Sequence, residues 1–177
     1  VTTEHYGLSE VHYYLNNSYL NTLQEEVKNK LVNTTIQYTD SISTNQSTTK
    51  SVTAKAFIPA LKEVENNTAY DPKSLKTMDY FYTKSFVSCV GILNDSIWTR
   101  SEIMGWNGFM NIPLYITYVT YNGDEHVHTA TDSTYPAYVV PFMNVPSDLL
   151  ITDNVTNGYY SFVFNEPPVI QTINNIQ

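Results

Sequence analysis

The sequence predicts an α+β domain in which helices come first and antiparallel strands follow. Apolar residues recur every three or four positions between residues 20 and 31, which is helical spacing. From residue 54 onward, short apolar runs are separated by turn residues, and Asn122–Gly123 lies between two alternating runs. An Asn-Gly pair in that setting is the strongest short signal for a β-hairpin. Helices gathered before the strands favour an α+β fold over a parallel α/β sheet.

The first forty residues are expected to be mainly helical. A short helix is predicted at about residues 8–15, and a second at 19–31 with Ser18 as its N-cap. The stretch 39–53 is rich in Ser and Thr and is nearly free of apolar residues. That composition predicts an exposed loop or the tip of a long hairpin.

Strands are expected through the rest of the chain, bounded by turn residues or prolines. They span residues 56–58, 112–120, 125–131, 137–145 and 159–164. Pro141 and Pro146 limit the ladder of the fourth strand, and residues 75–82 are expected to contain a helical turn. The pair Pro167–Pro168 favours an extended connection. One domain is therefore predicted over residues 1–165, with residues 166–177 as a linker to a following module.

Charge and composition argue against several function classes. The chain of 177 residues has a net charge of −8 and a single arginine, Arg100. A nucleic-acid binder needs a basic patch, and the same negative charge disfavours docking on anionic lipid. No apolar run approaches the ~18 residues that span a bilayer. Cys89 stands alone, so no internal disulfide is possible, and a small buried thiol is expected.

The motifs of common enzyme classes are not found in the sequence. It has no glycine-rich phosphate loop, no Gly-x-Ser-x-Gly elbow and no Cys-x-x-Cys. Scattered carboxylates such as Glu63 are expected on solvated faces or in turns and not as a catalytic pair. His126 and His128 share one face of a predicted strand and resemble a metal-binding pair, but a third ligand at a recognised spacing is lacking. We therefore expect no catalytic residue, no cofactor and no metal, with both histidines at an exposed edge.

The composition is instead typical of a binding surface. Tyrosine occurs 15 times, and Tyr, Asn and Ser combine large contact area with adaptable hydrogen bonds. A glycine-hinged loop at 104–110 places two aromatic residues together, and tyrosines follow on the next strand. The candidate ligand-binding residues are Trp106, Asn107, Phe109, Tyr115, Tyr118 and Tyr121. The alternatives are a loop folded back over the core and an ordinary outer face of a sheet.

Four segments in a fixed order carry a resemblance to a known family. They are Gly7 to Asn16, Ala54 to Val64, Ile97 to Ser101 (Ile-Trp-Thr-Arg-Ser) and Val140 to Pro146. Their order and spacing, over about residues 7 to 151, resemble an uncharacterised domain family of Gram-positive bacteria and their phages. Two positions depart from its pattern, since His12 stands where arginine is frequent and Val140 where an Arg-Pro pair is usual.

That family looks related to the C-type lectin-like fold of formylglycine-generating enzymes and phage receptor-binding proteins. The resemblance implies two helices packed on a twisted, mostly antiparallel sheet, with long loops forming a ligand surface. It also implies that Trp98 and Arg100 form a structural hub. Arg100 is expected to make a buried bidentate pair with a carboxylate or with backbone carbonyls, and Trp98 to fill the core. The lone Cys89 removes the copper-dependent oxidation chemistry of the enzyme branch.

The expected function is a non-catalytic surface-binding domain of a phage virion protein (tail, baseplate or head decoration) that contacts host glycan. Partners would be a host glycan or protein and other virion proteins, and a homo-oligomer is possible. The first alternative is a purely structural assembly or decoration module of the virion. The second is an adhesin domain on a bacterial cell surface. A cell-wall hydrolase ranks last, because it needs two carboxylates facing each other across a cleft.

Overall fold

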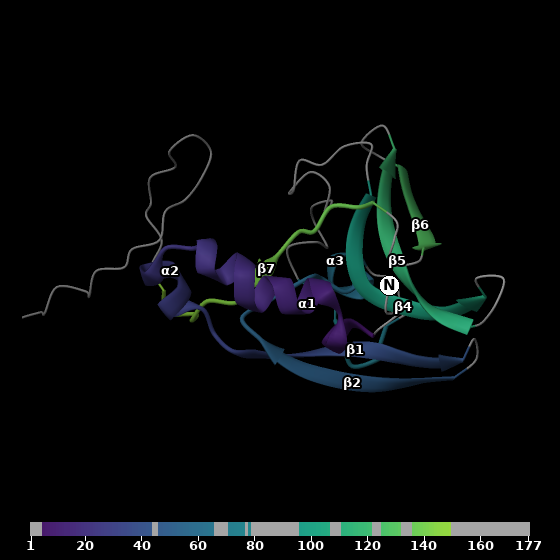
Figure 1. Cartoon of the computed structure of the whole chain (residues 1–177), viewed down its shortest axis with the longest axis horizontal. Helices are drawn as coiled ribbons and strands as arrows, with labels where there is room; N and C mark the ends of the chain where they lie inside the picture. The colour runs from purple at the N-terminus through teal and green to yellow at the C-terminus, as the bar shows by residue number, and fades with distance from the viewer. Residues whose placement is uncertain are drawn as a thin grey trace, which may run out of the picture.

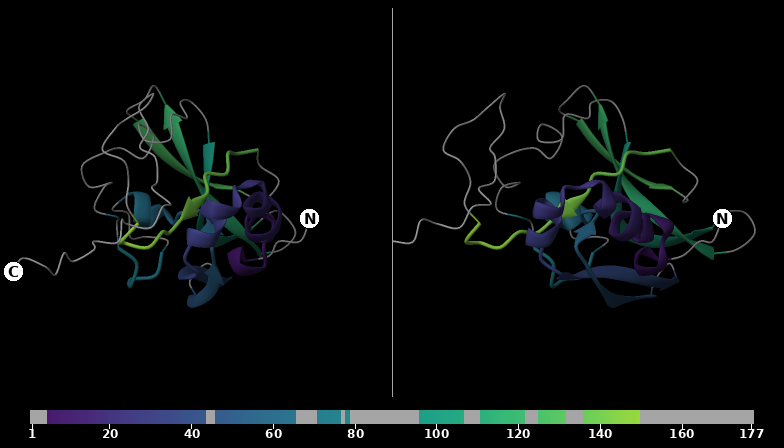
Figure 2. Two further views of the ribbon diagram at one scale, coloured as in Figure 1. Left: turned by 90° about the vertical axis from the view of Figure 1, so that its left-hand side faces the viewer. Right: turned by 60° about the vertical axis from the view of Figure 1, so that its left-hand side comes forward.

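The computed structural model describes residues 5–43, 46–65, 71–76, 78, 96–106, 111–121, 125–131 and 136–149. Within these, residues 41–43, 46–47, 104–106, 111–121 and 125–131 are described by their backbone only. Short helices and small antiparallel sheets make up the described part, so the predicted α+β class is confirmed. The helical run lies along one hairpin, and a three-stranded sheet rises near one end of it (Figures 1 and 2). No helix in these ranges is long and apolar enough to cross a membrane.

The N-terminal segment forms a chain of short helical pieces. They are η1 Tyr6–Leu8, α1 Glu10–Tyr14, the π-helical η2 Leu15–Tyr19, η3 Leu20–Thr22 and α2 Glu25–Lys30. Ser9 caps α1, because its hydroxyl oxygen accepts the N–H of His12 at 3.2 Å. The helix predicted at 8–15 is therefore present, somewhat shorter than expected.

The single helix predicted over residues 19–31 is wrong. The chain becomes extended at Leu23, with φ −78° and ψ 150°, and α2 begins two residues later. Ser18 lies inside η2 and caps nothing there. The hydroxyl of Thr22 donates to the carbonyl of Tyr19 at 2.7 Å. Such local bonds offer the backbone an alternative to the helical ladder, which explains a break that apolar spacing does not reveal.

Strands begin earlier than the sequence suggests. β1 Thr34–Ser43 pairs antiparallel with β2 Gln46–Ala54, so the expectation of helix up to residue 40 is wrong. Of the two alternatives for residues 39–53, the long hairpin is present. Ile36 and Tyr38 are two positions apart and both buried, which places one face of β1 on the core.

The three-stranded sheet contains the predicted hairpin. β4 Ser96–Trp106 pairs with β5 Asn111–Tyr121, which pairs with β6 Glu125–Thr131, all antiparallel. The turn predicted from Asn122–Gly123 is flanked by the pair Tyr121 and Glu125. The register of β4 against β5 shifts between Trp98 and Glu102, and such an irregularity bends a strand.

The later segments contribute less strand than predicted. β3 Ala56–Phe57 pairs with β7 Phe142–Met143, and α3 Leu61–Val64 follows β3. Of the strand predicted at 137–145, only β7 and one parallel bridge between Tyr138 and Ile97 form. Pro141, which has no N–H, lies between those two contacts.

Several expectations concern parts of the chain beyond the description. The strand at 159–164, the linker at 166–177, the domain boundary at 165 and Cys89 all lie outside the described residues. Of the helical turn expected at 75–82, residues 75, 76 and 78 are described, and none of them is helical.

The hydrophobic core joins the helical pieces, the first hairpin and the start of β4. Its buried members are Tyr6, Leu15, Leu20, Leu31, Ile36, Tyr38, Ala56, Phe57, Ile58 and Trp98. Packing is tight at Gly7, where an added Cβ would lie 2.5 Å from the phenol oxygen of Tyr38. A glycine there lets the N-terminal segment approach β1 closely.

Candidate functional site

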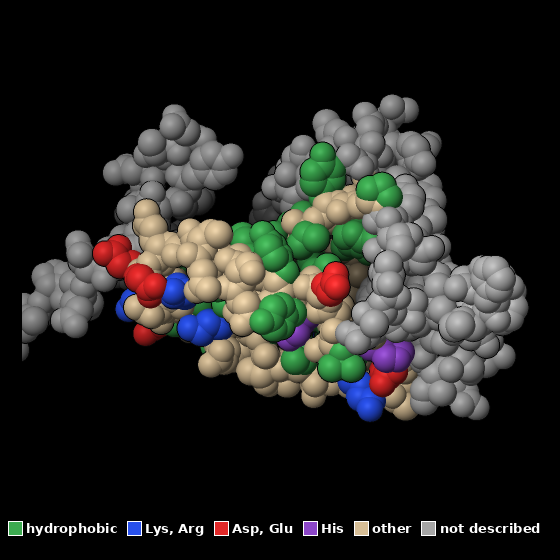
Figure 3. Space-filling model, viewed as in Figure 1, with side chains coloured by type: hydrophobic (Ala, Val, Ile, Leu, Met, Phe, Trp, Pro, Cys, Tyr) green, Lys and Arg blue, Asp and Glu red, His purple; other side chains and the backbone are tan. Residues whose placement is uncertain are grey.

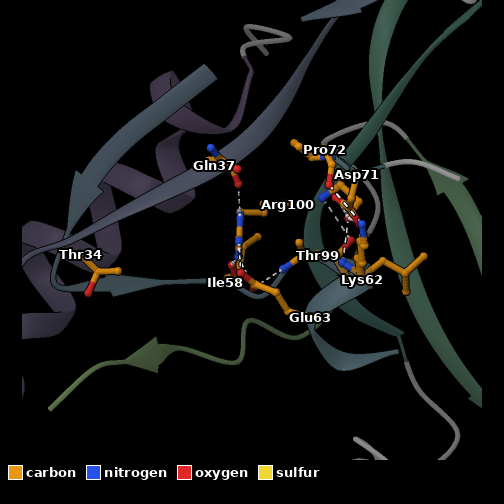
Figure 4. Close-up of polar contacts among 12 residues, drawn as sticks. Thr34, Gln37, Ile58, Lys62, Glu63, Asp71, Pro72, Thr99 and Arg100 are labelled. Atoms are coloured by element: carbon orange, nitrogen blue, oxygen red, sulfur yellow. Dashed lines mark hydrogen bonds and ion pairs between the residues drawn. The ribbon is translucent and has the colours of Figure 1, made fainter. Parts of the chain in front are cut away.

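Arg100 is completely buried, and its guanidinium contacts three separate segments. Nε donates to the carbonyl of Gln37 in β1 at 2.8 Å, and Nη1 donates to the carbonyl of Ile58, also at 2.8 Å. Both terminal nitrogens donate to the carboxylate of Glu63, with Nη1 2.7 Å from Oε2 and Nη2 bound to Oε1 (Figure 4). This fork-to-fork geometry is the strong form of an arginine–carboxylate pair. We call Arg100, Glu63 and the two carbonyls the Arg100 hub.

Glu63 is the partner that the sequence does not reveal. The expectation that it lies on a solvated face is wrong, because its side chain is only 12% exposed and binds Arg100. Glu63 also accepts the N–H of Ala60 at 3.0 Å, which caps the first turn of α3. The guanidinium carbon of Arg100 lies 5.6 Å from the ring centroid of Phe57, within cation–π range. Trp98, two residues earlier on β4, is buried in the core.

A second buried polar network adjoins the Arg100 hub. The Ser101 hydroxyl donates to the Asp71 carboxylate at 2.6 Å, and Asp71 also accepts the N–H of Lys62 at 2.9 Å. Burial raises the pKa of Asp71 above its ordinary value, although these hydrogen bonds oppose the shift. The Lys62 ammonium is buried too and donates to the carbonyl of Lys73 at 3.1 Å. These charges fasten the 71–76 segment to α3 and β4.

The four segments that carry the family resemblance meet in this region. Asn16 donates to the carbonyl of Ala56 at 2.8 Å and accepts the N–H groups of Lys55 and Ala56. The rings of Phe57 and Phe142 pack 6.4 Å apart. Through the Glu63 pair described above, the second segment also reaches the third. Residues far apart in the sequence therefore share one framework.

Tyr6 extends this framework to the N-terminal segment. Its phenol oxygen accepts the N–H of Ile58 at 3.2 Å, and its side chain is fully buried. Burial raises the pKa of Tyr6 to about 12. His12 packs edge-on against the Tyr6 ring at 5.4 Å, and burial lowers the pKa of this imidazole. His12 is therefore held in its neutral form at neutral pH.

A separate group of ionisable residues lies further along β1 and β4. His5 Nδ1 is 2.7 Å from Oε1 of Glu102 in β4, and His5 Nε2 is 2.8 Å from Oδ1 of Asp40 in β1. Glu102 is fully buried, whereas the side chains of His5 and Asp40 are 28% and 20% exposed. We call these three residues the His5 cluster. Sequence reasoning missed it, because its members lie at positions 5, 40 and 102 without a shared motif.

The predicted ligand-binding residues are spread along the three-stranded sheet. Trp106 pairs with Asn111 at one end, and Tyr121 pairs with Glu125 at the other. Ten positions of β5 separate Asn111 from Tyr121, about 34 Å along the strand at ~3.4 Å per residue. Asn107 and Phe109 lie outside the described residues. The described residues of this set do not converge on one small pocket.

The strand register also divides this set between two faces. Cross-strand partners share a face, and successive positions alternate. Positions 106, 115 and 121 fall on the face that also carries Glu102, the partner of Tyr115. Position 118 falls on the opposite face, with Ile97 on one side and His128 on the other. By register, position 118 therefore lies on a different face from positions 106, 115 and 121, and the platform itself stays a prediction.

The tips of two hairpins project on the same side of the molecule. β4 is buried from Ser96 to Glu102 and then runs four residues further, to Trp106. The paired ends of β1 and β2, at Ser43 and Gln46, lie on that side as well (Figures 1 and 2). Elsewhere, Figure 3 shows hydrophobic side chains gathered between the helical run and the segment 136–149. Tyr14 of α1 and Tyr138 are among the exposed aromatic residues.

The fold and this network define a small α+β domain whose buried charges hold distant segments together. The chain belongs to the family described as "Domain of unknown function (DUF6273)", whose model matches residues 1–147. That match includes all four segments named above. No curated protein matches the chain. No solved structure matches it either.

Proposed function

We propose that this chain is a non-catalytic surface-binding domain that contacts a host-surface glycan through the tip of the β4–β5 hairpin. The observation that carries the proposal is the division of β4 into two parts. Its first part is buried and fixed by Arg100, and its second part continues to Trp106, where the pairing with β5 ends at Asn111. Rigid support for a variable tip is how binding residues are held in many domains.

The residue types at the two tips suit a sugar ligand. Trp106, Asn107 and Phe109 combine aromatic faces with an amide. The β1–β2 tip on the same side is made of Ser, Thr, Asn and Gln with a single isoleucine over residues 41–48. Aromatic faces stack on sugar rings, and amides or hydroxyls bind sugar hydroxyls with adaptable hydrogen bonds.

The strand register favours an elongated ligand over a single sugar. Tyr115 and Tyr121 share a face with Trp106, but they lie progressively further from the tip. Tyr115 is paired with the buried Glu102, so contact should weaken from the tip inward. A polysaccharide chain is therefore the class of glycan that we propose.

The proposed location of the domain rests on the family resemblance that the four sequence segments carry. A C-type lectin-like fold would present long loops on one side, which agrees with the position proposed for the two tips. The same resemblance supports a virion surface of a phage as the location, with a bacterial cell surface as the alternative. A purely structural module of the virion is the competing function, in which the aromatic tip contacts protein.

A glycan array that carries cell-wall polysaccharides of Gram-positive bacteria tests the proposal. The wild-type chain should bind at least one polysaccharide, and Trp106→Ala should weaken that binding by about tenfold or more while the melting temperature stays within a few degrees. One stacked aromatic residue at a contact commonly carries such an effect. Tyr118→Ala is the matched control, because its position lies on the opposite face, and its binding should equal wild type.

The outcomes separate the candidate functions. Equal losses for Trp106→Ala and Tyr118→Ala would contradict the assigned face, and undiminished binding by Trp106→Ala would contradict the tip. If no polysaccharide binds and the chain instead self-assembles through Trp106, as measured by light scattering of both proteins, the structural-module alternative replaces the glycan proposal.

A further inference from the structure

We propose that His5, Asp40 and Glu102 form a binding site for a divalent transition-metal ion, with zinc as the best match. This inference is independent of glycan binding, because Asp40 and Glu102 lie partway along β1 and β4 and not at the tips of the two hairpins. Each residue offers one ligand atom, and the three atoms lie within 4.8 Å of one another. The residues come from the N-terminal segment, β1 and β4, so one ion would join three separate parts of the chain.

The donor set points to a transition metal. One imidazole and two carboxylates suit zinc, which takes nitrogen at ~2.0–2.1 Å and oxygen at ~2.0–2.2 Å. Calcium and magnesium favour sites built entirely from oxygen. Ligand atoms around a tetrahedral ion are about 3.4 Å apart at those bond lengths. A separation of 4.8 Å would therefore need to close by about 1.4 Å, whereas His5 Nδ1 and Glu102 Oε1, which are 2.7 Å apart, would need to open slightly. Side-chain rotation can supply both changes.

The local charge favours a cation. Two carboxylates converge on one imidazole, and Glu102 is fully buried. A buried carboxylate is costly unless a positive charge or several donors compensate it. Lys50 is 3.6 Å from Asp40 and its side chain is 54% exposed, so this lysine compensates the Asp40 carboxylate weakly.

The His5 imidazole contacts one carboxylate through each ring nitrogen, Glu102 through Nδ1 and Asp40 through Nε2. A metal ion would replace this bridge by taking one ring nitrogen of His5 and an oxygen from each acid. The partly exposed side chains of His5 and Asp40 leave room for water as a fourth ligand. The ion would then pin the segment around His5 to the sheets.

Calorimetric titration of the full chain with zinc chloride, after removal of metal with EDTA, tests the site. We expect one ion per chain. At a free zinc concentration of 100 times Kd, the melting temperature should rise by about 5 °C or more. Binding should weaken as pH falls, because protons compete for the imidazole. Manganese is expected to bind more weakly than zinc, and calcium more weakly still.

Two variants and one control decide the assignment. His5→Gln and Glu102→Gln should each lower zinc affinity by about tenfold or more. Circular dichroism shows whether each variant folds. Because the His5 side chain is partly exposed, His5→Gln is the safer test if Glu102→Gln folds poorly. The double variant His126→Gln/His128→Gln is the matched control and should bind like wild type. Absence of zinc binding in wild type, loss in the control, or retention in His5→Gln would each overturn the proposal.

Discussion

The Arg100 hub and the His5 cluster lie on the same strand, two residues apart at Arg100 and Glu102, yet they differ in kind. The Arg100 hub pairs a permanent cation with one carboxylate and two carbonyls, all nearly or fully buried. The His5 cluster sets two carboxylates around one titratable imidazole at a partly open edge. A balanced, enclosed pair serves as framework, whereas an excess of negative charge open to solvent is suited to bind a cation.

The Arg100 hub should give the largest effect when it is broken. Arg100→Met leaves the Glu63 carboxylate buried without its cation, and the free energy of unfolding should fall by about 3 to 5 kcal/mol. Urea denaturation measures this loss. The double variant Arg100→Met/Glu63→Leu should recover part of it, because neither charge is then left unpaired.

Lys50→Met is the matched control for that experiment. It removes a lysine whose ammonium is half exposed and 3.6 Å from Asp40, so stability should change by less than about 1 kcal/mol. Equal losses for Arg100→Met and Lys50→Met would contradict the distinction between an enclosed pair and an exposed one.

Ionisation of Tyr6 at alkaline pH should lower the free energy of unfolding by a smaller amount. Its pKa is about 12 in the folded protein against the ordinary value of 10.0, because burial disfavours the phenolate. The corresponding stability is fully present below pH 10 and is lost as pH rises toward 12. The loss should approach about 2 to 3 kcal/mol. Denaturation between pH 9 and 12 measures it, and Tyr6→Phe should show a shallower decline because it has no phenol to ionise.

Sequence patterns predicted the elements that depend on local signals. The hairpin of β5 and β6 follows from Asn122–Gly123, and the short strand β3 follows from an apolar run closed by Pro59. The break at Leu23 was not predictable from spacing, because it accompanies a bond between Thr22 and Tyr19 and the separate burial of Leu20 and Leu31. β1 was missed for residues 34–38, because the first forty residues were expected to be mainly helical although the predicted helix ended at residue 31.

The buried polar residues show where sequence reasoning ends. Arg100 was picked out as the single arginine within a short motif, but nothing in the sequence connected it with Glu63, 37 positions away. The His5 cluster spans 97 positions and has no motif at all. Candidate aromatic residues were identified by type, while their separation and their division between two faces depend on the strand register. Contacts between distant segments are set by tertiary packing, which residue spacing does not encode.

Native-state hydrogen exchange tests the difference between the two clusters most directly. The Arg100 N–H donates to the Pro59 carbonyl at 2.9 Å, and the Leu8 N–H donates to the His5 carbonyl at 2.8 Å. The Arg100 amide should exchange only with global unfolding, and zinc should slow it no more than it raises global stability. The Leu8 amide should exchange through local opening, and zinc should slow it by about tenfold or more. Equal protection of both amides without metal, or an unchanged Leu8 rate in zinc, would contradict the account.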